Sequence, residues 1–105
     1  MIFITGGMSQ GKTTFAHNFN LEIIDNLHII IKNWLDNSEN IEENIKNLLK
    51  KDDIVIICQE IGCGIVPMDK NERVWREVTG RTACIIAKKA EKVFKLDCGI
   101  AIQIK

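Results

Sequence analysis

A run of nine residues near the start of the chain has the residue types and spacing that bind phosphate. It reads Gly6, Gly7, Met8, Ser9, Gln10, Gly11, Lys12, Thr13 and Thr14. Glycines at positions 6 and 11 let backbone N–H groups turn inward and approach phosphate oxygens. Lys12 would reach the β- and γ-phosphates with a catalytic role, and Thr13 would place its hydroxyl on Mg²⁺. The run therefore predicts a nucleotide-binding loop that takes GTP or ATP with Mg²⁺.

The segments on either side of this loop supply the setting that its chemistry needs. A short apolar run over residues 2–4 predicts a buried parallel strand, and residues 13–20 predict a helix with one apolar face. The first turn of such a helix offers its unpaired N–H groups and positive dipole end to an anion. A chance glycine turn followed by a lysine is the alternative, and the strand–loop–helix order argues against it.

Two carboxylates that follow predicted strands are candidate catalytic residues. Asp25 ends an apolar run at residues 21–25, which predicts a strand, with a helix as the competing interpretation. Glu60 follows residues 54–58, the clearest strand of the chain. α/β proteins bind ligands beyond the carboxyl ends of their strands, which makes both carboxylates candidates. We expect Glu60 to contact the metal or the substrate. The alternative for Asp25 is an ordinary carboxylate at a strand end, and the alternative for Glu60 is a cap on nearby loop N–H groups.

Four further polar side chains are weaker candidates. Arg73 and Arg76 lie one turn apart on a predicted helix, where they could contact phosphate or substrate from one face or simply face solvent. His28 could accept a phosphoryl or guanylyl group, but its apolar helical neighbours favour a structural role. His17 lies on the loop's own helix, past the first turn.

The remaining periodicity predicts alternating helices and strands. Helical spacing covers residues 27–35 and 41–49, and a long helix spans about residues 69–92. Two strands, over residues 93–96 and 100–104, close the chain around a short turn. The order β-α-β-α-β-α-β-β predicts an α/β fold: a P-loop NTPase-like three-layer sandwich with a mostly parallel sheet and a C-terminal strand pair.

Local residue types predict where the later helices begin. Ser38 is the expected N-cap of the helix over residues 41–49. Asp69 followed by Glu72 resembles a capping box, and Gly80 is a point at which the long helix could bend. Both tryptophans of the chain are expected in the core.

Size, charge and hydropathy bound the class of protein. A chain of 105 residues predicts one domain, residues 1–105. The charges of the 14 acidic and 14 basic residues cancel, so the chain has no net positive charge that would attract nucleic acid. The start of the chain lacks the features of a signal peptide and the apolar runs are too short to span a bilayer, so we expect a cytoplasmic protein without membrane contact. The 4 cysteines lack metal-ligand spacing and are expected to be reduced thiols acting as small apolar residues.

A second glycine-containing string strengthens the interpretation of the loop. Its residues are Glu60, Gly62, Gly64, Ile65, Val66 and Pro67. With the loop and residues 73–77, it resembles the bifunctional adenosylcobinamide kinase/adenosylcobinamide-phosphate guanylyltransferase family of cobalamin biosynthesis. That family carries G-G-x-x-S-G-K-S, then E-x-G-x-G-I-V-P, then R-x-F-R-D. Here Gln10 replaces the serine of the first string, and the third string reads Arg-Val-Trp-Arg-Glu.

The chain also departs from this family in ways that bear on its activity. Family members carry a long segment after the first helix, and that segment holds the histidine that takes up the guanylyl group; no such segment is present here. Residues 24–28 and 34–35 resemble the family's D-C-L-T-x-W-L stretch, which implies that Asp25 is the carboxylate beside Mg²⁺. The resemblance therefore implies a shortened member of the family.

The resemblance implies a reaction and an assembly. We expect Mg²⁺-dependent phosphoryl transfer from GTP or ATP to a cobinamide, with guanylyl transfer lost along with the histidine segment. A homo-oligomer, a trimer by resemblance, is also expected. The alternative is a non-catalytic nucleotide-binding remnant or subunit, which needs only the loop.

Overall fold

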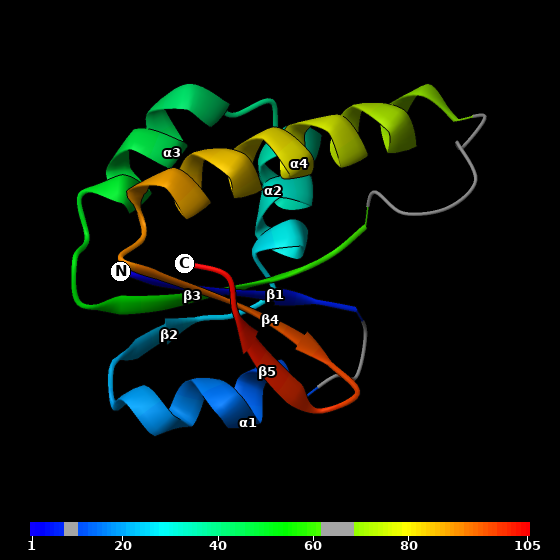
Figure 1. The fold of residues 1–105 in the computed structure, drawn as a ribbon. Helices are drawn as coiled ribbons and strands as arrows, with labels where there is room; N and C mark the ends of the chain where they lie inside the picture. Colours follow the sequence, from blue (N-terminus) through cyan, green and yellow to red (C-terminus); the bar gives the residue numbers. More distant parts are fainter. Residues whose placement is uncertain (8–10, 62–68) are drawn as a thin grey trace.

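The structure is a computed structural model that describes residues 1–7, 11–61 and 69–105. In these residues a five-stranded sheet of order β2-β3-β1-β4-β5 lies between two layers of helices (Figure 1). The strands are β1 (Ile2–Gly6), β2 (Glu22–Ile24), β3 (Ile54–Gln59), β4 (Lys92–Asp97) and β5 (Ile100–Gln103). The helices are α1 (Lys12–Ala16), the 3₁₀ turn η1 (His17–Phe19), α2 (Leu27–Asp36), α3 (Ile41–Leu49) and α4 (Lys70–Lys89). The predicted α/β sandwich is confirmed.

The sheet is parallel apart from its last strand. β1 pairs in parallel with β3 on one side and with β4 on the other, and β2 pairs in parallel with β3. β5 returns antiparallel to β4. The turn between them places Cys98 at φ 51° and Gly99 at φ 76°. Two successive positive φ values suit a tight hairpin turn, so the predicted C-terminal strand pair is confirmed.

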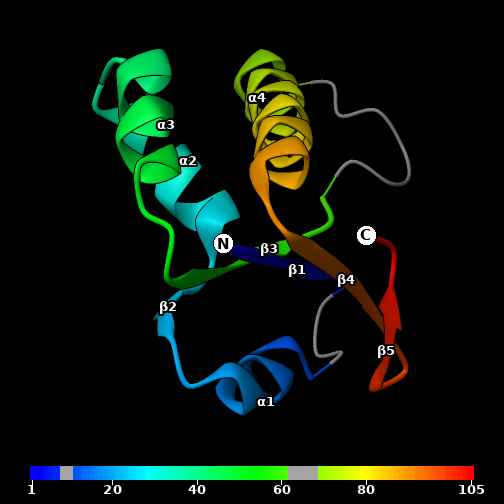
Figure 2. The same cartoon turned by 60° about the vertical axis from the view of Figure 1, so that its left-hand side comes forward.

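Helices cover both faces of the sheet (Figure 2), and an apolar cluster holds them to each face. On one face, α2, α3 and α4 pack over a cluster that includes Leu27, Ile31, Ile56 and Ile86, all fully buried. On the other face, α1 and η1 pack over a smaller cluster around Ile4. The rings of Phe15, Phe19 and Phe94 lie within 5.6 Å of one another between α1, η1 and β4, measured between centroids.

One expectation about where the later helices begin is corrected by the structure. The N-cap of α3 is Asn40, whose side chain accepts a hydrogen bond from the Glu43 N–H, and Ser38 instead lies in the preceding turn at φ 53°. Asn40 takes this place because it immediately precedes the first helical residue, where a side-chain oxygen reaches the N3 amide. Asp69 does cap α4, but through the Asn71 N–H. α4 then continues through Gly80 as one helix.

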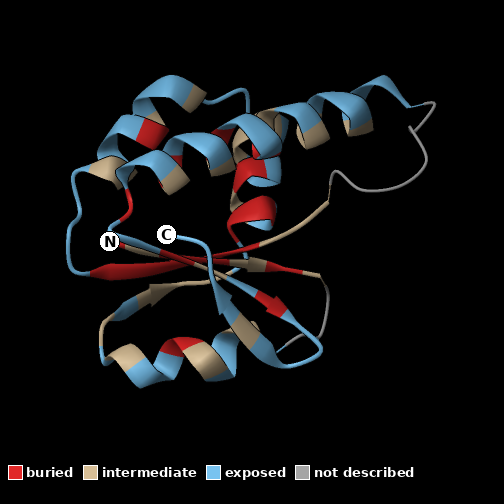
Figure 3. Cartoon of the chain, viewed as in Figure 1, coloured by how far each residue is buried: buried red, intermediate tan, exposed pale blue. Residues whose placement is uncertain are grey.

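Burial follows the layers, as Figure 3 shows: red segments concentrate on β1, β3 and the inner helix faces, whereas β5 is mostly exposed. Both tryptophans, which were expected in the core, lie at its margin: they are half-buried and pack against the larger cluster. Cys58 is buried, but Cys84 and Cys98 are exposed, so the apolar role expected for the cysteines is wrong for those two. None of the helices described is long and apolar enough to cross a membrane.

Candidate nucleotide-binding site

The ends of β1 and β3 form the edge at which the candidate site lies. Gly6, the last residue of β1, is in register with Gln59, the last residue of β3. The Glu60 N–H donates a hydrogen bond to the Gly6 carbonyl oxygen at 2.9 Å, which holds the two strand ends together. The glycine-rich loop therefore leaves the sheet beside Glu60, at the carboxyl edge where α/β proteins bind ligands.

The backbone requires glycine at both ends of the loop that the structure describes. Gly6 has φ 153°, and a Cβ atom there would lie 2.5 Å from the Leu96 carbonyl oxygen. Gly11 is the N-cap of α1 and has φ 81°, in the left-handed region that side chains disfavour. The three loop residues between Gly7 and Gly11, namely Met8, Ser9 and Gln10, lie outside the described residues.

The Lys12 side chain connects the two described ends of the loop. Its ammonium donates a hydrogen bond to the Gly7 carbonyl oxygen, so it stands between the end of β1 and the first turn of α1. A cation held at this point faces any phosphate bound at the N-terminus of the helix. Thr14, the last loop candidate, is exposed in the same first turn.

The structure brings Thr13 and Asp25 together across 12 residues of sequence. The Thr13 hydroxyl donates to Asp25 Oδ2 at 3.0 Å, and the Asn26 N–H donates to Asp25 Oδ1 at 2.7 Å. Because the Thr13 hydroxyl donates its hydrogen bond to Asp25, the lone pairs of its oxygen are left for a cation. Hydroxyl and carboxylate oxygens are ligands that Mg²⁺ prefers.

His28 follows Asp25 by three residues and lies in the first turn of α2. It is only 6% exposed, and its Nδ1 accepts a hydrogen bond from the Gln59 N–H at 3.3 Å. Its carbonyl oxygen accepts the indole N–H of Trp75 at 2.8 Å. His28 thus joins α2 to the end of β3 and to α4, which is the structural role that its neighbours predicted.

Burial lowers the pKa of His28, and the positive charge of Lys12 lowers this pKa further, while Asp25 opposes both effects. A lower pKa favours the neutral imidazole, and a neutral ring whose Nδ1 accepts the Gln59 N–H carries its proton on Nε2. Next to it, burial raises the pKa of the Cys58 thiol to about 11. This thiol remains protonated near neutral pH, so it is a core residue and not a nucleophile.

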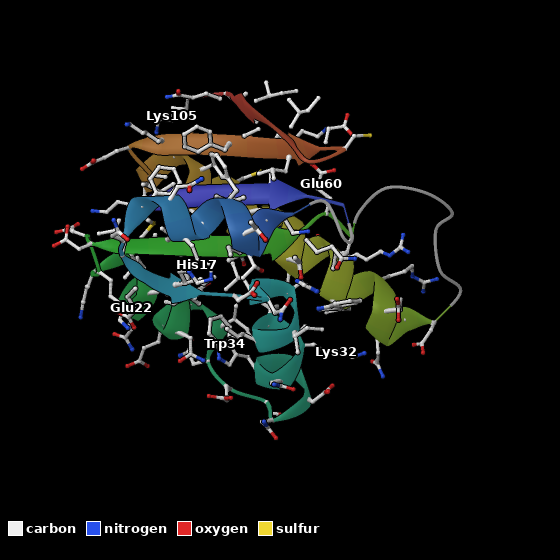
Figure 4. All side chains as sticks on the ribbon, turned by 90° about the horizontal axis from the view of Figure 1, so that it is seen from below. His17, Glu22, Lys32, Trp34, Glu60 and Lys105 are labelled. Carbon is white, nitrogen blue, oxygen red and sulfur yellow. The ribbon has the colours of Figure 1, made fainter. Side chains whose placement is uncertain are left out.

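Glu60 has an ionic partner that the sequence did not indicate. Its carboxylate lies 3.7 Å from the ammonium of Lys95, on β4. Glu60 is therefore turned across the end of β1 toward β4, near the ends of the central strands (Figure 4). The only sequence signal for Lys95 was a single lysine inside an otherwise apolar strand.

The other candidates lie on α4 or outside the described part of the chain. Arg73 is exposed in the early part of α4, and Arg76 is half-buried one turn later. Most of the second glycine-containing string, residues 62–67, lies outside the described residues. Within the described part of the chain, no three His, Cys, Asp or Glu side chains gather to hold a metal ion. A metal at Thr13 and Asp25 would therefore need phosphate oxygens and water to complete its ligands.

Comparison with known proteins points to one family. A family model described as cobinamide kinase / cobinamide phosphate guanyltransferase matches residues 18–104. The bifunctional adenosylcobalamin biosynthesis protein CobU of Salmonella typhimurium is 35% identical over 52 residues, which are 50% of this chain. The match covers only 29% of that relative's length. The family match begins after the glycine-rich loop, so the assignment of that loop to phosphate binding rests on its own sequence and backbone geometry.

Proposed function

We propose, since the chain belongs to the cobinamide kinase / cobinamide phosphate guanyltransferase family, that it transfers the γ-phosphoryl group of GTP or ATP to a cobinamide. The observation that carries this proposal is the Thr13–Asp25 hydrogen bond of 3.0 Å beside Lys12, at the carboxyl edge of the sheet. These groups have the chemistry that phosphoryl transfer requires, which is mainly positioning and neutralisation of charge.

Each residue of the site would have a separate task. Backbone N–H groups of the loop and of α1 would bind the phosphates, and Lys12 would contact the β- and γ-phosphates. Asp25 would orient the Thr13 hydroxyl, and the two would hold Mg²⁺, which neutralises charge on the β- and γ-oxygens when bound. Glu60 would contact the metal or the substrate, with Lys95 fixing its position.

The arginines of α4 complete the proposed site. Arg73 and Arg76 would contact phosphate or substrate from one side of the helix, because a guanidinium forms strong charge-assisted hydrogen bonds with phosphate. Both belong to the string that resembles the family's R-x-F-R-D.

We propose further that the guanylyl-transfer step is lost. Covalent transfer needs a nucleophilic nitrogen at the α-phosphate. The unprotonated nitrogen of neutral His28 is Nδ1, which already accepts the Gln59 N–H and is buried. His17 is exposed on η1, after the end of α1.

Labelled nucleotide tests both steps in one experiment. With γ-labelled GTP or ATP, Mg²⁺ and adenosylcobinamide, we expect the label on the cobinamide. With α-labelled GTP, we expect no label on the protein after denaturing electrophoresis. An acid-labile, base-stable label on the protein would show a phosphoramidate and contradict the loss of guanylyl transfer. Absence of γ-label transfer, with nucleotide binding intact, would contradict the kinase.

One observation favours a second candidate function. The family's histidine segment has no counterpart in this sequence. A chain of this kind could hold nucleotide without catalysis, as a remnant or as a subunit of a larger assembly. Such a protein would bind nucleoside triphosphate in the experiment above but leave the γ-label on the nucleotide.

We also propose that the protein self-associates, with a trimer implied by the family resemblance. β5 is the last strand in the sheet order, and three isoleucines on or next to it are widely exposed: Ile100 by 66%, Ile102 by 52% and Ile104 by 62%. Their alternate spacing places them on one face. An exposed apolar row on an outer strand is a typical contact surface between chains.

Replacement of Ile102 by Lys should shift the protein toward monomer, because a charge would be buried in that contact. Sedimentation velocity at micromolar concentration measures the change. Gln103→Lys is the matched control: it adds the same charge one residue later, on the opposite face, and should leave the assembly unchanged. A wild-type protein that sediments only as monomer would contradict the proposal.

A further inference from the structure

A cleft between α2 and α4 lies next to the candidate site and has no part in the function proposed so far. Its volume is about 440 Å³, which is within the range of small-molecule sites. From α2 it is lined by Lys32, Leu35 and Asp36, and from the first half of α4 by Asn71, Glu72 and Trp75. Figure 4 shows Lys32 on α2, with the first half of α4 beside it.

Trp75 connects this cleft to the phosphate site. Its indole N–H donates to the His28 carbonyl oxygen at 2.8 Å, and the two rings lie 6.5 Å apart between centroids. His28 in turn accepts the Gln59 N–H at the end of β3 and is within electrostatic reach of Lys12 and Asp25. One residue, His28, therefore separates the cleft wall from the groups that would meet the γ-phosphate.

The position of the cleft suits the molecule that accepts the phosphoryl group better than it suits the base or sugar of the nucleotide. Lys12 and Thr13 mark where the γ-phosphate and Mg²⁺ would lie. In phosphoryl transfer the attacking oxygen approaches the γ-phosphorus opposite the leaving diphosphate. The acceptor must therefore come from the side beyond the γ-phosphate. The contacts of Trp75 with His28, and of His28 with the end of β3, connect the cleft to the edge of the sheet where that phosphate would lie.

The charge of the cleft also selects against phosphate. Among the described residues, three carboxylates line it, those of Asp36, Asp69 and Glu72, against the single ammonium of Lys32. A polyphosphate would be repelled there. Carboxylates accept hydrogen bonds and donate none, so they would favour a neutral or cationic ligand that carries many N–H donors.

Apolar and aromatic side chains lie beside these carboxylates in the cleft, Leu35 on α2 and Trp75 on α4. Trp75 presents its indole, and the Lys32 ammonium lies 5.1 Å from the centre of that ring. Lys32 is exposed and could be displaced by a flat ligand edge that packs on the indole. The cleft thus joins an aromatic wall to a row of hydrogen-bond acceptors.

We infer that the α2–α4 cleft is the acceptor subsite, and that it takes the alcohol-bearing arm and the carboxamide-rich edge of a corrinoid. This inference rests on the proposed kinase reaction for the identity of the acceptor. The carboxamide N–H groups would donate to Asp36 and Glu72, and the ring edge would pack on Trp75. The acceptor hydroxyl would then point past His28 toward the γ-phosphate.

The test compares isosteric variants that remove charge but keep shape. In Asp36→Asn combined with Glu72→Gln, we expect the dissociation constant for cobinamide to rise about 10-fold or more, because two acceptors lose their charge. Calorimetry in the presence of a non-hydrolysable GTP analogue measures it. Binding of the analogue itself should not change. Glu42→Gln combined with Asp52→Asn is the matched control, since these carboxylates are exposed and do not line the cleft.

The outcomes separate the subsite from the reaction. Unchanged cobinamide affinity in the cleft variant, with phosphoryl transfer intact, overturns the subsite and leaves the kinase standing. Weakened cobinamide binding in a protein that transfers no phosphoryl group supports the subsite and overturns the kinase. Weakened binding of the GTP analogue would assign the cleft to the nucleotide and overturn the inference. A wild-type protein that binds no cobinamide overturns both proposals.

Discussion

Replacement of Lys12 by Ala is expected to remove most of the affinity for nucleoside triphosphate. The Lys12 ammonium crosses the loop opening onto the Gly7 carbonyl and would exchange that contact for the β- and γ-phosphates. A hydrogen bond to a charged group contributes about 1.5–3 kcal/mol, so the dissociation constant should rise roughly 10- to 100-fold. Calorimetric titration with GTP and with ATP, each with Mg²⁺, measures the change.

A lysine elsewhere on the surface provides the control for this variant. Lys46 is exposed on α3, on the opposite face of the sheet from α1. Lys46→Ala removes the same charge and should leave nucleotide affinity unchanged. Equal binding of GTP and ATP by the wild type and by Lys12→Ala would contradict the assignment of the loop.

Asp25→Asn is expected to weaken phosphoryl transfer with a dependence on Mg²⁺. Asparagine keeps the size of the side chain and an oxygen that accepts from Thr13, but it removes the negative charge that faces the cation. Loss of a group that orients a metal ligand costs about 10- to 100-fold in activity or metal affinity. The rate of γ-label transfer to cobinamide, measured over a range of Mg²⁺ concentrations, should fall and then recover in part at high Mg²⁺.

The control for Asp25→Asn should lose a carboxylate at the other end of the sheet. Asp53 is exposed just before β3 begins, so Asp53→Asn should show the transfer rate of the wild type at every Mg²⁺ concentration. If Asp25→Asn lowers the rate by the same factor at all Mg²⁺ concentrations, Asp25 does not act through the metal.

Much of the fold could be predicted because its signals are local. The continuous apolar run over residues 54–58, mostly β-branched, indicated a strand buried on both faces, and β3 covers these residues and Gln59. Spacing of apolar residues indicated α2 and α3 within a residue or two of their bounds. The family membership indicated by the two glycine-containing strings is also confirmed. The misplaced cap at Ser38 shows the limit, since Ser38 and Asn40 both have capping side chains and only the backbone conformation chooses between them.

The candidate site was predicted in part. The loop pattern indicated Thr13 as a metal ligand, and the family resemblance indicated Asp25. The structure places the Thr13 hydroxyl 3.0 Å from Asp25 Oδ2. The sequence did not indicate that Glu60 pairs with Lys95, because that ion pair depends on β4 lying on the far side of β1. His28 and Trp75 are 47 residues apart, and no periodicity in either helix indicates their hydrogen bond.

The sequence by itself therefore determined the elements, their order and the glycine positions of the loop, since each depends on residues within a few positions of one another. Gly6 and Gly11 are examples, because a phosphate-binding turn needs φ values that other residues disfavour. Only the tertiary structure decided the strand order, the partners of His28 and Glu60, and the cleft between α2 and α4. Those features depend on which apolar faces pack together. The spacing of apolar residues predicts that one face of a helix or strand is buried, but it does not indicate which other element packs against that face.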